Sequence, residues 1–227
     1  MRRWSDRGLL PVRRVGARHV RRFRRGDLER FDRPAGSQAA APVPASGASL
    51  LLAGRPLGTA HHLAAFYDSD SGRMRLSVPF LLDGLRKAQP TFLIAHGDVL
   101  DAYLAAFEKA PDVDVGRAID SGLLTVAPGP GTTVQEALDF WEAALWRALD
   151  GETVLIRAVG EMVSERERFV SEREMLAYDA ALDRTLKRFP CVVICQYDAR
   201  HFSGSTLLSA LKAHPDLFLM PMGPFLN

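Results

Sequence analysis

Polar side chains interrupt or follow several apolar runs, and these residues are the ones with which the chain could bind a ligand. His61 and His62 open one such run, which ends at Tyr67. Neighbouring residues of a strand point to opposite faces, so we expect one buried, hydrogen-bonded histidine and one exposed histidine. The buried one could line a ligand pocket. Because the two rings point apart, the pair is a poor metal chelate, even with Asp68 and Asp70 close in the sequence.

Cys195 closes another apolar run and is followed by Tyr197 and Asp198. The carboxyl ends of strands are where α/β sheets place their ligands, so these three residues could line a binding site. A free cysteine is as often a small core residue, and both interpretations stay open. Cys191 and Cys195 do not form a zinc site without further ligands. We therefore predict no metal and no other cofactor.

Arg157 lies within an apolar run, and Glu161 comes just beyond it. A charge in a buried strand needs a partner. An ion pair of Arg157 with Glu161 or with Asp198 would serve this purpose and be structural. The alternative is that Arg157 and Glu161 form the polar anchor of a ligand pocket.

Nucleotide hydrolysis is not predicted. Phosphate-binding loops of the Gly-x-x-x-x-Gly-Lys-Ser/Thr type hold phosphates with backbone N–H groups and a lysine. The glycine-containing segments 54–58 and 129–133 both lack the lysine, and no strand end offers a clear acidic pair for magnesium. We accordingly expect a protein that is not an enzyme.

The elements that must position these residues alternate along the chain. Continuous apolar runs predict strands, and apolar residues at helical spacing predict helices. Strands without polar alternation, separated by helices, indicate a mostly parallel sheet covered on both faces, which is an α/β fold. The predicted strands cover 63–67, 90–95, 123–127, 153–158 and 191–195, with a candidate last strand at 217–220, and the predicted helices cover 73–87, 98–108, 133–149, 165–189 and 206–213.

The charges are strongly segregated. Residues 1–33 hold 12 Arg and four acidic residues, a net of +8, whereas the remaining residues have a net of −6. A basic arm of this kind suits a polyanion such as DNA. Residues 34–58 begin with a stretch rich in Ala, Pro, Gly and Ser, which is typical of a flexible linker. No apolar run is long enough to span a bilayer, and the two cysteines suit a reducing cytoplasm, where we expect the protein to reside.

The basic segment, residues 1–33, resembles part of the winged helix-turn-helix of MerR and excisionase proteins. It has an Arg-Arg-Trp stretch ending in Gly8-Leu-Leu-Pro11, an arginine-rich wing, and then Arg-Arg-Phe23 with Asp27-Leu-Glu-Arg-Phe31. The first helix of that motif is absent, so we expect a truncated copy or a start further upstream. The resemblance implies contact with double-stranded DNA through Arg2, Arg3, Arg7, Arg13, Arg14, Arg18, Arg21 and Arg22.

Residues 59–220 resemble the MEDS domain, the sensory domain of DcmR-like regulators and of methanogen and methylotroph signalling proteins. The landmarks include His61-His62 to Asp68, Pro79 to Leu85, Arg157 to Met162, Glu174 to Asp179, Cys195 to Asp198, and His214-Pro215. This family implies a RecA/KaiC-like α/β core that senses small, hydrocarbon-derived compounds. DcmR-like proteins also carry an N-terminal helix-turn-helix, so the two resemblances support each other.

Together these patterns predict a DNA-binding transcription regulator with a sensory domain for a small effector. The expected ligand-binding residues are His61, His62, Tyr67, Arg157, Glu161, Cys195, Tyr197 and Asp198. The effector would favour one arrangement of two DNA-binding arms in a homodimer, which the symmetry of operators leads us to expect. No membrane association is expected. The alternative is a protein-interaction or signalling module that has kept the sensory fold and lost DNA binding.

Overall fold

The computed structural model describes residues 50–149 and 153–227. The helix-turn-helix predicted at 1–33 and all eight of its predicted DNA-contacting arginines lie outside these residues. So does the linker prediction up to residue 49.

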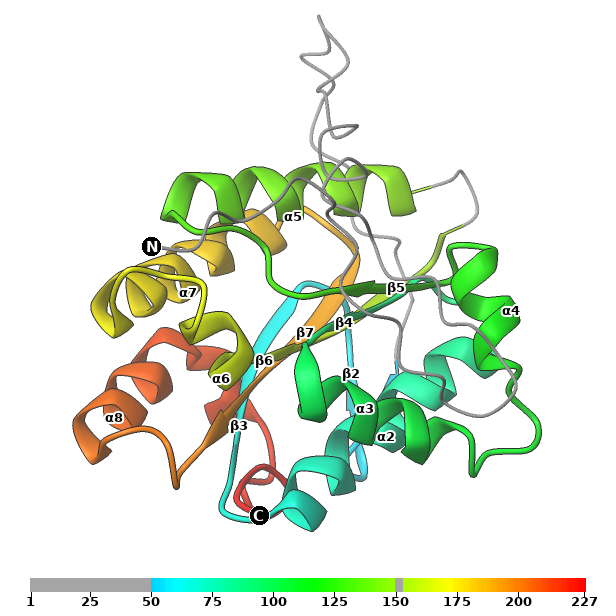
Figure 1. The fold of residues 1–227 in the computed structure, drawn as a ribbon, viewed down its shortest axis with the longest axis horizontal. Coiled ribbons are helices and arrows are strands. Elements are labelled where there is room, and N and C mark those ends of the chain that lie inside the picture. Colours follow the sequence, from blue (N-terminus) through cyan, green and yellow to red (C-terminus); the bar gives the residue numbers. More distant parts are fainter. Residues whose placement is uncertain (1–49, 150–152) are drawn as a thin grey trace, which may run out of the picture.

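A five-stranded parallel sheet forms the centre of the molecule (Figure 1). Its order is β3-β7-β6-β4-β5, and every neighbouring pair is parallel. The strands are β3 (His61–Tyr67), β4 (Thr91–Ile94), β5 (Leu124–Ala127), β6 (Ile156–Glu161) and β7 (Cys191–Asp198). The α/β fold class predicted from the sequence, a mostly parallel sheet flanked by helices, is thereby confirmed.

Helices cover both faces of the sheet, with α5 and α7 on one face and α2 and α3 on the other (Figure 1). Several begin at a Ser, Thr or Asp whose side chain accepts from a backbone N–H of the first turn, as at Ser69, Thr133 and Ser171. The helices are α2 (Asp70–Arg86), α3 (Gly97–Phe107), α4 (Val115–Asp120), α5 (Val134–Ala148), α6 (Met162–Arg166), α7 (Glu172–Leu186) and α8 (Gly204–Ala213), followed by the 3-10 helices η1 (Pro215–Leu219) and η2 (Gly223–Phe225).

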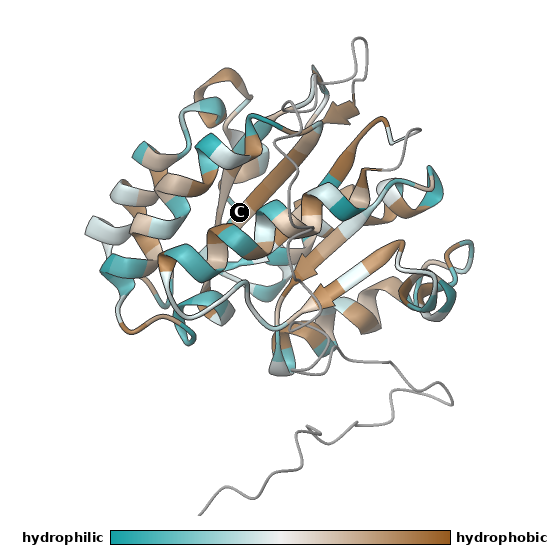
Figure 2. Ribbon diagram, turned by 90° about the horizontal axis from the view of Figure 1, so that it is seen from above, coloured by the Kyte–Doolittle hydropathy of each residue, from teal (hydrophilic) through white to brown (hydrophobic). Residues whose placement is uncertain are grey.

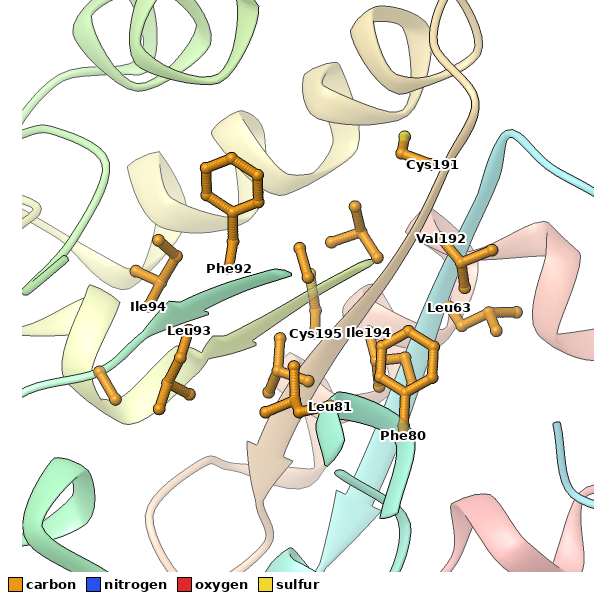
Figure 3. Close-up of a cluster of buried hydrophobic side chains, with 14 of the residues drawn as sticks. Leu63, Phe80, Leu81, Phe92, Leu93, Ile94, Cys191, Val192, Ile194 and Cys195 are labelled. Carbon is orange, nitrogen blue, oxygen red and sulfur yellow. The ribbon is translucent and has the colours of Figure 1, made fainter. Parts of the chain in front are cut away.

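The core lies on both sides of the sheet because successive strand residues alternate between the two faces. Phe92 points toward α5 and α7, whereas Leu93 points to the opposite face (Figure 3). The ring of Phe92 lies 6.0 Å from that of Trp141 in α5. Strands coloured as hydrophobic therefore run through the middle of the molecule, while hydrophilic positions gather on the outer sides of the helices (Figure 2).

Four details of the sequence prediction are wrong. The helix expected at 165–189 is two helices, α6 and α7, because Phe169 leaves the helical path to stack on Tyr178 and Ser171 caps α7. The last strand expected at 217–220 is instead the 3-10 helix η1. The strand expected at 153–158 lies three residues later, as β6. The short helix α4 had not been predicted.

The end of the predicted linker is folded. Strands β1 (Leu50–Leu52) and β2 (Arg55–Leu57) form an antiparallel hairpin inside the range 34–58. Leu50, Leu52 and Leu57 are buried in the core, because alternate residues of the hairpin face the domain. Residues 50–57, part of the predicted linker, therefore belong to the folded domain predicted to begin at 59.

Candidate functional site

Strand β7 distributes polar residues to both faces of the sheet. Cys195 and Tyr197 point to the face covered by α7, and Gln196 points to the face covered by α2 and α3, since successive residues alternate. The register brings in residues from β3 and β6: Gln196 lies opposite Glu161, and Val193 lies opposite His62. Two separate buried polar clusters result, one on each face.

The glutamate cluster consists of Glu161, Tyr67, Tyr103 and Gln196. The hydroxyl of Tyr67 donates to Glu161 Oε2 at 2.9 Å, and the hydroxyl of Tyr103 lies 2.5 Å from Glu161 Oε1. Tyr103, from α3, also contacts the side-chain oxygen of Gln196. All four side chains are buried, and three of them lie at or near the carboxyl ends of parallel strands.

Proton counting indicates that Glu161 is protonated in part of the neutral range. The amide nitrogen of Gln196 donates to the carbonyl of Arg73, so its oxygen must accept from Tyr103. Tyr103 has a single hydroxyl proton, and a protonated Glu161 can donate to the same hydroxyl oxygen. Burial raises the pKa of Glu161 to about 7, although the charge of Arg73 and the hydroxyl of Tyr67 oppose the rise. Such a group can exchange a proton near neutral pH.

The histidine cluster consists of His62, Asp179, Cys195 and His214, all fully buried. His62 Nε2 lies 3.0 Å from His214 Nε2, 3.3 Å from Cys195 Sγ and 3.4 Å from Asp179 Oδ1. His214 Nε2 lies 3.5 Å from the same Asp179 Oδ1. One potential ligand atom of each residue therefore points to a common centre.

This arrangement does not suit nucleophilic catalysis by Cys195. In a cysteine–histidine–acid triad the thiol and the carboxylate contact opposite nitrogens of the imidazole ring. Here Cys195 and Asp179 both face Nε2 of His62. Burial raises the pKa of the Cys195 thiol, and the nearby Asp179 and Glu165 raise it further, so the nucleophilic thiolate is disfavoured.

The charges within the histidine cluster depend on one another. Burial and the neighbouring His214 lower the pKa of His62. Burial alone would lower the pKa of His214 and raise that of Asp179, but their mutual attraction reverses both shifts. Asp179 and His214 consequently favour their charged forms, while His62 favours its neutral form.

Arg157 lies apart from both clusters. Its guanidinium pairs with Asp83 at 2.5 Å and donates to Gln89 Oε1 and to the carbonyl of Phe80. The partners predicted from the sequence, Glu161 and Asp198, are therefore wrong. The reason is that β6 is shifted along the chain, so that Arg157 lies near its start and Glu161 at its end. These contacts favour a structural role for Arg157 over a role as the polar anchor of a ligand pocket.

The remaining predicted residues are divided between the clusters and the surface. His62 is buried and His61 is partly exposed, where it contacts Asp216, as expected for neighbours on a strand. Tyr197 contacts the histidine cluster from outside by donating to Asp179 Oδ2 at 2.5 Å. Asp198 pairs with Arg200 and stays outside both clusters.

Four residues of the two clusters were not predicted, namely Tyr103, Asp179, Gln196 and His214. Asp179 carries a signal that was available, because it shares the apolar stripe of its helix with Met175, Leu182 and Leu186. An acidic residue on a buried stripe requires a partner. His214 lies far from His62 in sequence and Tyr103 lies far from Glu161, so only the tertiary fold brings each pair together.

A surface hollow of about 550 Å³ lies elsewhere, at the amino ends of β4, β5 and β6. Gln89, Phe92, Leu123 and Leu155 are among its lining residues. None of its lining residues belongs to either cluster. The surface hollow therefore lies at the amino ends of the strands, whereas the glutamate cluster lies near their carboxyl ends. Among the described residues, no helix combines the length and the apolar character needed to cross a membrane.

Two solved structures are similar to this chain over part of its length. The flagellar accessory protein FlaH from Methanocaldococcus jannaschii is similar with a TM-score of 0.49 and 9% identity, covering 70% of each chain. The KaiC-like protein PH0186 from Pyrococcus horikoshii OT3 is similar with a TM-score of 0.49 and 13% identity, covering 62% of each chain.

Sequence comparison finds a relative that aligns with nearly the whole chain. The chain is 35% identical over 230 residues to the transcriptional repressor DcmR of Methylorubrum extorquens, an alignment that covers 98% of this chain and 86% of that protein. The family model of the methanogen/methylotroph, DcmR sensory domain matches residues 61–215, which include both buried clusters. The chain therefore belongs to the MEDS family and is a DcmR-like protein.

Proposed function

We propose that the chain is a transcription regulator whose N-terminal basic segment contacts DNA and whose MEDS domain binds a small effector. The observation that carries the proposal is the 35% identity with the repressor DcmR across 98% of this chain, since an alignment of that extent includes most of the basic segment as well as the sensory domain. The segregation of positive charge into residues 1–33 supports the same division of roles.

DNA binding is tested with the purified full chain and duplex DNA from the region upstream of its own gene. Fluorescence anisotropy should show binding that weakens steeply with salt, because arginines release counterions from phosphates. Changing Arg21 and Arg22 together to Ala should reduce the slope of log K against log salt by about 2. Arg55→Ala, a change at an exposed residue of the hairpin β1–β2, is the control and should leave the slope unchanged.

Two outcomes would contradict DNA binding. One is an affinity that does not change between low and moderate salt. The other is an equal loss of affinity in the Arg55→Ala control. Either outcome would favour a protein-interaction module that has the sensory fold without a DNA-binding role.

The glutamate cluster is our proposed effector site. Its hydroxyl, carboxyl and amide groups converge near the carboxyl ends of β3, β6 and β7, the usual position of ligands in α/β sheets. A carboxyl group that titrates near neutral pH and is held by two tyrosines can donate or accept a hydrogen bond to a small polar or halogenated compound. No catalytic step is proposed, since the named relative is a repressor.

A thermal-shift screen of one-carbon and halogenated compounds tests the effector site. A compound that binds the folded state raises the melting temperature with its concentration. Tyr67→Phe should weaken the response of any such compound, whereas Gln89→Ala, in the surface hollow, should not. The reverse result would move the effector to the hollow and reject the glutamate cluster.

Effector binding would act on DNA by favouring one arrangement of two subunits in a homodimer. Light scattering of the purified chain should therefore give the mass of a dimer, and the effector should change DNA affinity without changing that mass. A monomer that binds DNA equally well with and without effector would contradict this coupling.

A further inference from the structure

We propose that His62, Asp179, Cys195 and His214 bind a four-coordinate transition-metal ion of the zinc type. The proposal starts from the convergence of four potential ligand atoms that all lie within 4.8 Å of one another. They come from four segments, β3, α7, β7 and the turn between α8 and η1. It is independent of the effector and of DNA binding.

The spacing of the ligand atoms fits a tetrahedral ion. Bonds of about 2.0 to 2.3 Å from zinc to nitrogen, oxygen and sulfur imply tetrahedron edges of roughly 3.3 to 3.8 Å. Of the six edges, the three from His62 to Cys195, His62 to Asp179 and His214 to Asp179 are 3.3, 3.4 and 3.5 Å, and the His62–His214 edge is slightly shorter at 3.0 Å. Two imidazoles, a carboxylate and a thiolate form a mixed nitrogen, oxygen and sulfur set, which suits zinc and cobalt better than calcium or magnesium.

The other polar atoms of two ligands already have partners. His214 Nδ1 lies 2.7 Å from the carbonyl of Ala210, which fixes its proton there and leaves Nε2 with a free lone pair. Asp179 Oδ2 accepts from Tyr197, whereas Asp179 Oδ1 is buried and has no hydrogen-bond partner. Supporting hydrogen bonds of this kind orient metal ligands in proteins. The unpartnered Oδ1 is the atom that faces the common centre.

A divalent ion would also balance the charge. With Cys195 as thiolate and Asp179 as carboxylate, the ligands contribute two negative charges, which a divalent cation neutralises. Without an ion, the alternative is a proton shared in an Asp179–His214 pair. In that alternative His214 donates from Nε2 to the neutral His62 at 3.0 Å, but the carboxylate oxygen of Asp179 stays 3.4 to 3.5 Å from both histidines, beyond the usual range of a charge-assisted hydrogen bond.

Such an ion would have a structural role. Four protein ligands close a tetrahedral site, whereas a catalytic zinc keeps one position open for water or substrate. The ion would tie edge strand β3 to β7 and would anchor the segment that follows α8. All four ligands are buried, so exchange of the ion would require local opening of the domain.

The test uses the purified full chain and cobalt as the probe. After removal of metal with a chelator under reducing conditions, Co²⁺ is titrated in. We expect the visible absorption of tetrahedral Co²⁺ with a thiolate-to-cobalt charge-transfer band, saturating at one ion per chain and displaced by Zn²⁺. Elemental analysis of protein purified without added chelator should find one transition-metal ion per chain.

The chain supplies matched control pairs. Cys195→Ser should remove the charge-transfer band and weaken Co²⁺ binding more than about tenfold, whereas Cys191→Ser, on the same strand, should leave both unchanged. His62→Gln should weaken binding, and its neighbour His61→Gln should not. A wild-type chain that shows no thiolate band with Co²⁺ would overturn the proposal, as would equal behaviour of the Cys195 and Cys191 variants.

Discussion

The two buried clusters lie on opposite faces of β7 and satisfy their polar atoms in different ways. In the glutamate cluster each acceptor faces a hydroxyl or amide donor, and a proton on Glu161 completes the chain from Glu161 through Tyr103 to Gln196. In the histidine cluster four ligand atoms face one another, and Asp179 Oδ1 has no hydrogen-bond partner. All hydrogen-bonding groups of the glutamate cluster have partners when Glu161 is neutral, whereas the histidine cluster needs a positive charge at its centre.

The contrast explains why a similar degree of burial shifts two carboxyl groups in opposite directions. Burial raises the pKa of Glu161 to about 7 because its tyrosine partners are neutral and Arg73 offsets only part of the cost. Asp179 is also fully buried, but two histidines hold its pKa well below the usual range. Because both carboxyl groups are fully buried, the charges of the neighbouring side chains decide which of the two is ionised.

The largest effect should come from removing the charge of Asp179. Asp179→Asn leaves the charged His214 without its counter-charge, and breaking a buried charge pair costs about 3–5 kcal/mol of stability. Urea denaturation at neutral pH measures the loss. Asp183→Asn is the matched control one turn later in α7, where the carboxylate is partly exposed and 3.9 Å from His62. If the two variants lose equal stability, the charge of Asp179 has no special role.

The next effect concerns pH. Glu161→Gln keeps an acceptor for the tyrosines and removes the titration. Because the folded-state pKa of Glu161 is raised from 4.5 to about 7, the folded state holds the extra proton, and the wild type loses stability as pH rises from 4.5 to about 7. The variant should therefore gain on the order of 3 kcal/mol relative to wild type across this window. A stability difference that is constant with pH would show that Glu161 titrates normally.

The sequence predicted the sheet because continuous apolar runs such as Cys191 to Ile194 are distinctive of buried parallel strands. It also predicted that one of His61 and His62 is buried, since alternation along a strand is a local property. The break between α6 and α7 escaped prediction because Phe169 is apolar, like the helical stripes around it. The cause of the break is its stacking on Tyr178, a tertiary contact.

The candidate site could be predicted only in part. His62 and Cys195 were recognised as residues that could bind a ligand, but their partners Asp179 and His214 come from elements that join the cluster through helix packing. Sequence spacing carries no information on such contacts. The same holds for Tyr103, whose position in α3 was apparent while its contact with Glu161 was not.

A smaller effect on stability should distinguish the two tyrosines of the glutamate cluster. Tyr103 contacts Ser77, Glu161 and Gln196, whereas Tyr67 donates to Glu161 alone. Tyr103→Phe should cost about 1–3 kcal/mol because buried acceptors lose their donor, and Tyr67→Phe should cost less. Tyr67→Phe should also raise the pKa of Glu161 further, because the carboxylate loses the hydroxyl that donates to it. Denaturation and the pH dependence of stability measure the two quantities, and a larger cost for Tyr67→Phe would contradict the proton count.

The smallest effect is expected at His61, which lies outside both clusters. His61 is partly exposed and contacts Asp216, which also pairs with Lys187, so His61→Gln leaves the carboxylate with a partner. Its stability should stay within about 0.5 kcal/mol of wild type, as for most surface changes. His62→Gln, one residue later, should be strongly destabilising because it opens the centre of the histidine cluster. Equal effects of the two changes, measured by urea denaturation, would mean that the convergence on Nε2 of His62 contributes nothing to the folded state.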